Sequence, residues 1–360
     1  MSEPSPTRRK RRGRIFRFGA ALLVLSAVAA YLVVQYVTGG GASRGCKVVS
    51  GTQKGTSYEF TPEQAANAAT IAAVGTGRGM PERAVTIAIA TALQESGLRN
   101  IEHGDRDSLG LFQQRPSQGW GTERQIMDPA YAAGIFYAHL ARVPGYTDLP
   151  LTVAAQRVQR SGYPEAYAKH EPDATLLAAA LTGYAPASLS CDGRPQSTAA
   201  TAGTAAGTTA GTAAGTQADA AAGTQADAAA QTGPDAVRAA LVRDFGRDAL
   251  QETGAEVGGT AVPSPSPSPS VTATAHGRTV TVPVPQGARK DASGRTEQER
   301  GWQLAHWAVA NSSALHIQRV VYAGREWTAS NGGGSWHSAG SAGAAGAERS
   351  VGAVRIVTGQ

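Results

Sequence analysis

The sequence predicts a mainly α-helical domain over residues 46–191, preceded by one transmembrane helix and followed by disordered linkers and a small α/β module. Three observations lead to this fold class. An uncharged, apolar run of 20 residues extends from Phe18 to Val37. Helix-patterned segments fill the stretch between the only two cysteines. Beyond the second cysteine, Ala/Thr/Gly and Pro/Ser stretches have compositions that cannot bury a core.

The apolar run predicts a membrane anchor. A helix over residues 18–37 would span about 30 Å, which is the thickness of the bilayer's hydrocarbon layer. Residues 1–17 carry seven Lys/Arg and one Glu, and this basic tail favours a cytoplasmic N-terminus. We therefore expect a single-pass protein of the cell membrane with extracellular C-terminal domains. The alternative is a cleaved signal peptide, with the small residues at 39–43 as its cleavage region.

The charge distribution argues against nucleic acid as a partner. The basic tail alone contributes a charge of +6, which equals the net charge of the whole chain. Everything after residue 17 therefore sums to zero, and the pI of about 9.5 reflects the tail.

The two cysteines, Cys46 and Cys191, bracket the predicted helical domain. A lone pair in an exported protein predicts one disulfide, which would restrict the unfolded chain by closing a long loop. Two unpaired thiols are the alternative.

Helix signals fill the bracketed domain. Thr61 to Gln64 have the pattern of an N-cap, a proline at the first helical position and a capping box, and the helix is expected to end at Gly75. Pro81 opens a second helix over 82–95 that is apolar on every side, which is typical of a buried helix. Further helical patterns cover 128–142, 151–159 and 172–182.

The remainder of the chain alternates between linkers and a small module. An Ala/Thr/Gly linker with an eight-residue repeat covers 192–233. A small α/β accessory module is expected over 234–357, interrupted by a Pro/Ser spacer at about 254–275. Its expected elements are a helix (234–253), a strand (279–284), a helix (297–312) and three further strands (319–322, 325–328 and 352–357).

Glu95 is the strongest candidate for a chemical role. It lies in the last turn of the apolar helix, where burial and the helix dipole both raise a carboxyl pKa. A protonated carboxyl near neutral pH is suited to general acid catalysis. The alternative is a glutamate at a helix end that simply faces solvent.

Three motifs resemble the lysozyme-like superfamily of lytic transglycosylases and goose-type lysozymes. They are Glu95-Ser96-Gly97-Leu98, then Leu109-Gly110-Leu111-Phe112-Gln113-Gln114, then Asp128-Pro129-Ala130-Tyr131. Residues 104–121 are also similar to a lysozyme-like module of membrane-anchored actinobacterial surface proteins. The resemblance covers about 60–190, and it implies cleavage of peptidoglycan glycan strands with Glu95 as the general acid.

The resemblance also implies roles for other residues. A hydrolase needs a second carboxylate, for which Asp105 and Asp107 are the candidates, whereas a transglycosylase uses the sugar's own 6-hydroxyl. These two aspartates are alternatively parts of a polar turn. The residues expected to bind glycan are Ser96, Phe112, Gln113, Gln114, Trp120, Gln156 and Gln159.

One departure from the family leaves the reaction type open. Lytic transglycosylases carry an Ala-Tyr-Asn-Ala-Gly-like segment whose tyrosine lies over the acid, but the corresponding residues 154–164 contain no Tyr-Asn pair. The sequence therefore leaves three alternatives: a lytic transglycosylase, a muramidase, or a catalytically inactive protein that binds peptidoglycan on the same scaffold.

No metal or cofactor is expected. The seven histidines are scattered and lack ligand spacing. The C-terminal module resembles an actinobacterial cell-wall domain related to zinc-dependent peptidases, yet it lacks the His-x-His strand of those domains. The module is therefore expected to be non-catalytic. A single apolar span without intramembrane charge also argues against a transporter or sensor.

Overall fold

The structure is a computed structural model that describes residues 45–51, 55–161, 164–192, 233–247, 277–284, 294–329, 334–339 and 352–359. The chain divides into two units, Met1–Arg44 and Gly45–Gln360, and only the second contains described residues. Its described residues form eight α-helices, two 3₁₀ helices and two antiparallel sheets.

The longer elements of the first part are α2 (Pro62–Gly77), α3 (Glu82–Ser96), α5 (Pro129–Leu140), α6 (Leu151–Gln159) and α7 (Glu171–Leu181). Shorter helices are η1 (Pro116–Gln118), α4 (Glu123–Ile126) and η2 (Pro164–His170). A three-stranded sheet of order β2-β1-β3 accompanies them, made of β1 (Cys46–Val49), β2 (Ser57–Phe60) and β3 (Leu189–Cys191). The sequence did not predict these strands. Each has only three or four residues, which is too short to show a clear alternation of polar and apolar side chains.

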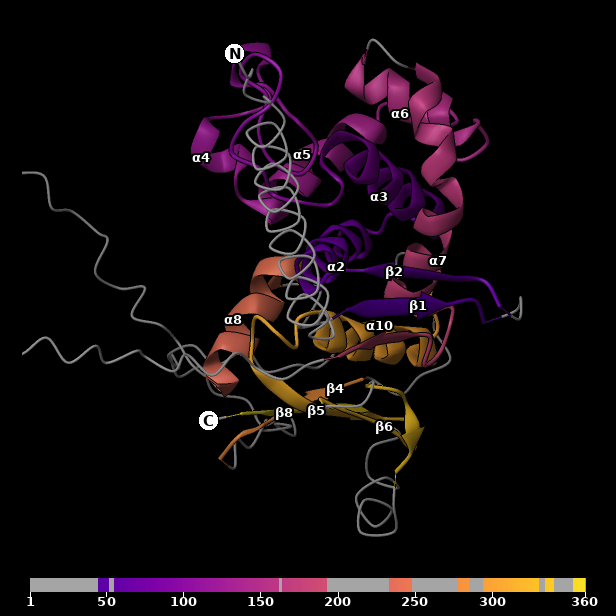
Figure 1. Cartoon of the computed structure of the whole chain (residues 1–360), viewed down its shortest axis with the longest axis vertical. Helices are drawn as coiled ribbons and strands as arrows, with labels where there is room; N and C mark the ends of the chain where they lie inside the picture. The colour runs from indigo at the N-terminus through magenta and orange to yellow at the C-terminus, as the bar shows by residue number, and fades with distance from the viewer. Residues whose placement is uncertain are drawn as a thin grey trace, which may run out of the picture. The chain divides into compact units, whose positions relative to one another are not determined.

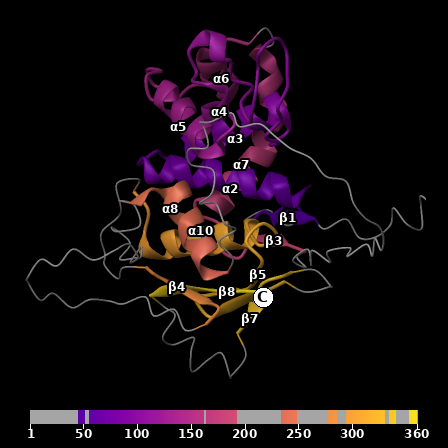
Figure 2. The ribbon, with the colours of Figure 1, turned by 90° about the vertical axis from the view of Figure 1, so that its left-hand side faces the viewer.

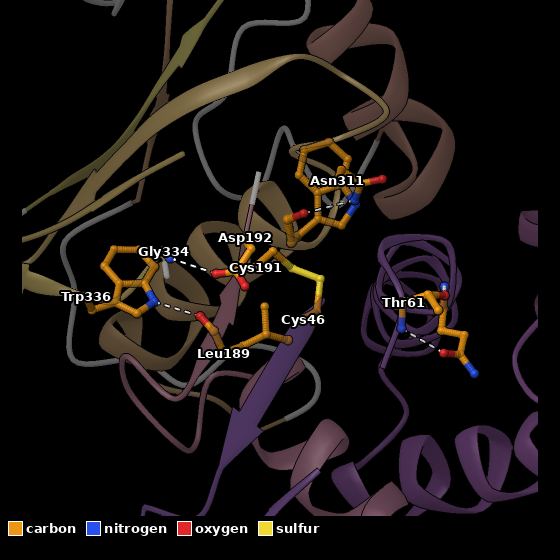
Figure 3. Close-up of a disulfide and its surroundings, with 10 residues drawn as sticks. Cys46, Thr61, Leu189, Cys191, Asp192, Asn311, Gly334 and Trp336 are labelled. Carbon is orange, nitrogen blue, oxygen red and sulfur yellow. Dashed lines mark hydrogen bonds between the residues drawn. A yellow bond between two sulfur atoms is a disulfide. The ribbon is translucent and has the colours of Figure 1, made fainter. Parts of the chain in front are cut away.

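The disulfide closes this small sheet. Cys46 on β1 faces Cys191 on β3 in antiparallel register, with their Cα atoms 4.0 Å apart. Figure 3 shows the bond beside the chain segment that carries Gly334 and Trp336. The predicted pairing of Cys46 with Cys191 is therefore confirmed.

The N-terminal end of α2 forms as the sequence predicts. The Thr61 side chain accepts a hydrogen bond from Gln64 N, and Thr61 N donates to Gln64 Oε1 at 2.8 Å, which completes the capping box. The other end differs, because Gly75 lies inside the helix rather than at its end. A Cβ atom at Gly75 would lie 2.6 Å from the ring of Tyr137, so this glycine permits close packing of α2 against α5.

The C-terminal part combines two helices with a second sheet. Its elements are α8 (Pro234–Phe245), β4 (Thr279–Pro283), α10 (Glu297–Ala310), β5 (Ile317–Tyr322), β6 (Arg325–Thr328), β7 (His337–Ser338) and β8 (Ala353–Thr358). The strand order is β4-β8-β5-β6-β7, with every neighbouring pair antiparallel. Both views show α10 between α2 and this five-stranded sheet (Figures 1 and 2). Helix α10 is buried along most of its length, so it packs on both neighbours at once.

Buried polar contacts join the C-terminal part to the first. Asp244 on α8 has a fully buried side chain whose Oδ2 accepts from Thr70 on α2 at 3.1 Å and from Trp307 on α10 at 2.8 Å. His306 Nδ1 lies 2.7 Å from the carbonyl oxygen of Ala180 on α7. Trp336 also donates to a carbonyl of β3, as Figure 3 shows. Residues of both parts belong to one continuous hydrophobic core.

The expected membrane anchor requires a correction. In the part of the chain that the structure describes, no helix is long and apolar enough to cross a membrane. The longest helix there, α2, has 16 residues, whereas about 20 are needed to span the hydrocarbon layer. The predicted span at 18–37 lies outside the described residues. The predicted fold class, with its transmembrane helix, is therefore wrong, and so is the single-pass cell-membrane localisation drawn from that helix.

Three further predictions fall on residues that the structure does not describe. These are the basic cytoplasmic tail at 1–17, nearly all of the linker at 192–233 and the Pro/Ser spacer at about 254–275.

Candidate active site

A cleft of about 880 Å³ opens at the C-terminal ends of α3, α5 and α6. Figure 1 shows these helices at the end of the unit farthest from the five-stranded sheet. The loop before α4 provides the remaining wall. The lining residues are Glu95, Asp105, Arg106, Ser108, Gln113, Gln114, Arg115, Gln118, Trp120, His139, Arg142, Val143, Arg157, Val158, Gln159, Arg160 and Ser161.

Glu95 contributes its carboxyl to this cleft from the end of a buried helix. Residues 84–93 of α3 are all buried, so the helix has little freedom to move its last turn. Gly97 then ends the helix in the left-handed region at φ +64, and its N–H donates to Leu93 O. Burial raises the pKa of Glu95, and hydrogen bonds from Tyr167 and Gln159 oppose part of that rise. The geometry expected of a buried acid in a cleft is therefore present.

Tyr167 on η2 is the main site residue that the sequence analysis missed. Its buried hydroxyl donates a hydrogen bond of 2.6 Å to Glu95 Oε1. The family's Tyr-Asn pair would fall within residues 154–164, and Tyr167 lies just beyond that segment in a different local sequence. Two residues separate it from Pro164, which begins the 3₁₀ helix, and the sequence around it forms no recognisable motif. A tyrosine therefore contacts the acid although the Tyr-Asn pair of the family is missing.

The glutamines predicted to bind glycan divide into two groups. Gln113, Gln114 and Gln159 line the cleft. Gln159 connects two segments that line the cleft. Its Nε2 donates to Phe112 O at 2.8 Å, and its side chain also hydrogen-bonds Glu95. Gln156 is absent from the lining and instead donates to Ser161 O at 2.6 Å, which ties down the turn after α6.

The other three residues predicted to bind glycan also differ in their surroundings. Trp120 lines the cleft and lies against the ring of His139, with ring centroids 4.5 Å apart. Phe112 is fully buried and stacks on Phe136 at 4.7 Å, so it belongs to the core. Ser96 Oγ donates to Leu111 O at 2.8 Å and accepts from Arg99 N, which fixes the loop that leaves α3.

The two candidate second carboxylates have different surroundings. Asp107 accepts from Arg115 Nε at 2.7 Å and from Ser117 N at 2.9 Å. Hydrogen bonds from Ser117, and then from Arg115, hold the pKa of Asp107 well below its usual range. Asp107 does not line the cleft, and its hydrogen bonds hold together the loop between residues 107 and 117. Asp105 lines the cleft with a side chain that is 93% exposed.

The cleft wall is a short turn held by backbone bonds. Leu109 and Gln114 pair through two N–H to O bonds of 3.0 Å. Gly110 in this turn has φ +73, and a Cβ atom there would lie 2.7 Å from the carbonyl oxygen of Ile126. Only glycine therefore fits this position, which explains the glycine within the motif from Leu109 to Gln114.

Across the part of the chain that the structure describes, no three His, Cys, Asp or Glu side chains lie close enough together to hold a metal ion.

Comparisons with known proteins address the C-terminal part. A family model described as "VldE, C-terminal domain" matches residues 242–349, which is less than a third of the chain. That match extends from the end of α8 to beyond β7 and includes none of the cleft residues. No curated protein matches the chain.

Proposed function

We propose that this protein cleaves the glycan strands of peptidoglycan as a lysozyme-like enzyme, with Glu95 as its general acid. The observation that carries the proposal is the pair of Glu95 and Tyr167. A carboxyl whose pKa is raised by burial lies in a cleft, and a buried tyrosine fixes its orientation. The resemblance of the motifs at 95–98, 109–114 and 128–131 to that superfamily supplies the substrate class.

The hydrogen bond from Tyr167 determines which oxygen can act. Tyr167 donates to Oε1 of Glu95, and we therefore assign the transferable proton to Oε2. In the proposed reaction, Oε2 gives this proton to the glycosidic oxygen as the bond to the muramyl anomeric carbon breaks. The carboxylate that remains then accepts the proton of the attacking hydroxyl, so Glu95 returns to its starting state.

The surroundings of the two aspartates favour a lytic transglycosylase over a muramidase. A hydrolase needs a second carboxylate at a fixed distance from the acid. Asp107 is hydrogen-bonded to Arg115 and Ser117, and Asp105 is nearly fully exposed, with Arg106 at 3.9 Å. Attack by the 6-hydroxyl of the muramyl residue needs neither aspartate. We therefore propose 1,6-anhydro-muramyl ends as the product.

The test is a mass analysis of peptidoglycan digested with the purified full chain. Anhydro-muramyl ends are the expected product, and they should be absent from a digest made with Glu95→Gln. Reducing ends would keep the proposed substrate and acid but would replace transglycosylation by hydrolysis. No soluble product from the wild-type chain, together with retained binding to the cell wall, would instead indicate the catalytically inactive binding protein.

A further inference from the structure

The cleft carries more positive charge than cleavage of a neutral sugar chain requires. Five arginines line it against two carboxylates, those of Glu95 and Asp105. Arg115 is paired with Asp107, and Arg106 lies near Asp105. The other three are Arg142, Arg157 and Arg160. These three are exposed, and within the described ranges none of them has a carboxylate within salt-bridge distance.

We propose that Arg142, Arg157 and Arg160 form a subsite for the carboxylates attached to the muramyl residues of the strand. This subsite makes the cleft select anionic glycans over neutral ones. The inference rests on the proposed function and deepens it by naming what distinguishes the substrate from other β-1,4-linked amino-sugar chains.

The arginines come together from two separate elements. Arg142 follows the end of α5, while Arg157 and Arg160 lie at the end of α6. His139 lies near both Arg142 and Arg160. Its pKa is lowered by burial first and then by the charges of these two arginines, so both guanidinium groups act on the same part of the cleft. Uncompensated like charges in a cleft cost free energy, and binding an anion there offsets that cost.

The backbone holds Arg160 in a conformation that arginine rarely adopts. Arg160 has φ +53 and ψ +37, in the left-handed region, and its N–H donates to Gln156 O at 2.8 Å. Gln156 Nε2 in turn donates to Ser161 O, so the turn is fixed on both sides. A non-glycine residue in this region stores strain, and such strain is concentrated at functional sites. The position thus combines a cleft-lining arginine with a conformation that favours glycine.

Carboxylates fit this subsite better than the sugar rings do. Sugar rings are bound by stacking and neutral hydrogen bonds, and Trp120 already offers an aromatic face beside His139. A guanidinium group binds a carboxylate through two parallel hydrogen bonds, which is the strongest pairing it makes. Muramyl residues carry carboxylates in two places: on the lactyl group when it is free, and on the stem peptide.

The experiment measures binding to three soluble glycans of equal length. The first is a neutral chitooligosaccharide, the second is a peptide-free muramyl strand with lactyl carboxylates, and the third is the same strand with stem peptides. All measurements use the full chain carrying Glu95→Gln, so that no ligand is cleaved. The double variant Arg142→Gln/Arg160→Gln removes charge, while Arg142→Lys/Arg160→Lys retains it. Arg124→Gln is the matched control, because Arg124 is exposed on α4 and does not line the cleft.

The glutamine double variant should lose at least about tenfold in affinity for a carboxylated strand at low salt and stay within about twofold for the neutral glycan. The lysine variant should recover part of the loss, and added salt should reduce the difference. A loss on the peptide-free strand identifies the lactyl carboxylate, and a loss that needs the peptide identifies the stem.

Two results would overturn the subsite alone: an equal loss for the neutral glycan, or no loss for either carboxylated strand. If the Glu95→Gln chain binds none of the three glycans, the proposed function itself fails, and the subsite fails with it.

Discussion

Tyr167 and Glu95 are 72 residues apart in sequence, yet the tyrosine hydroxyl lies 2.6 Å from Glu95 Oε1. The tyrosine is fully buried, and burial raises its own pKa, followed by the effect of the Glu95 charge. It therefore acts as a hydrogen-bond donor across the pH range in which the carboxyl titrates. This contact fixes the orientation of the carboxyl group of the acid.

Replacing Glu95 by Gln should abolish cleavage without loss of fold. The amide keeps the shape of the side chain but has no transferable proton, so the rate should fall by at least about 10²-fold. Because burial raises the folded-state pKa, ionisation of Glu95 destabilises the fold as the pH increases. The variant should therefore be more stable than wild type at pH 8, and the difference should shrink at pH 4. Turbidity loss of peptidoglycan and thermal unfolding at both pH values check this, and a variant that keeps wild-type activity would exclude Glu95 as the acid.

Replacing Tyr167 by Phe should change the pH dependence of cleavage. The hydrogen bond from Tyr167 lowers the pKa of Glu95, so its removal should raise that pKa further. The alkaline limb of the kcat/KM profile, which reports loss of the acid's proton, should move to higher pH, while kcat itself falls because the carboxyl loses its fixed orientation. An unshifted limb would mean that the hydrogen bond does not act on the catalytic acid. Tyr146→Phe, at a partly buried tyrosine outside the cleft, is the control.

Substitution of the two aspartates should separate the possible mechanisms. Asp105→Asn should leave cleavage within about threefold of wild type, because the exposed carboxylate has no role in a transglycosylase. Asp107→Asn should loosen the loop clamped to Arg115 and Ser117, and its effect should fall mainly on KM. A loss of kcat for either variant as large as that of Glu95→Gln would indicate a muramidase that uses that aspartate.

Removal of the disulfide should destabilise the whole unit. Cys46 and Cys191 enclose a loop with a sequence separation of 145, and bonds of this kind contribute about 2–5 kcal/mol to the free energy of unfolding. The double variant Cys46→Ala/Cys191→Ala should therefore unfold at lower denaturant concentration. Because β3 also carries the contact to Trp336, the C-terminal part should unfold in the same transition. Two separate transitions would contradict a shared core.

Buried His306 should make the protein sensitive to acid. Burial lowers its pKa to about 4 from an unperturbed value of 6.5, so protonation favours the unfolded chain. The contribution of neutral His306 to the free energy of unfolding is fully present above pH 6.5. It is lost as the pH falls towards 4, by up to about 3 kcal/mol. Denaturant titrations at intervals between pH 7 and 4 should show a shallower decline for His306→Leu than for wild type. His337→Gln, at an exposed histidine, should follow the wild-type curve.

The elements that local sequence specifies were largely predictable. The capping box of Thr61 and Gln64, the buried apolar helix that ends near Glu95, and the turn between β5 and β6 all depend on neighbouring residues. The end of α2 was not predictable in this way, because the neighbour that requires Gly75 is the ring of Tyr137 on another helix. The transmembrane helix was predicted from the length of an apolar run, and this prediction is wrong. No helix of the described residues is long and apolar enough to cross a membrane.

By itself, the sequence predicted the candidate acid, the helix that carries it and the pairing of the two cysteines, because the first two follow from local pattern and the third from a lone pair of cysteines. Only the tertiary structure decided what surrounds the acid. It brings Tyr167 and Gln159 to Glu95 from η2 and α6, bonds Asp107 to Arg115 within the loop, and places both Arg142 and Arg160 on the cleft wall. The physical reason is that hydrogen bonds and charges act through space. The pKa of a carboxyl depends on groups within a few ångströms of it, and none of those groups adjoins Glu95 in the sequence.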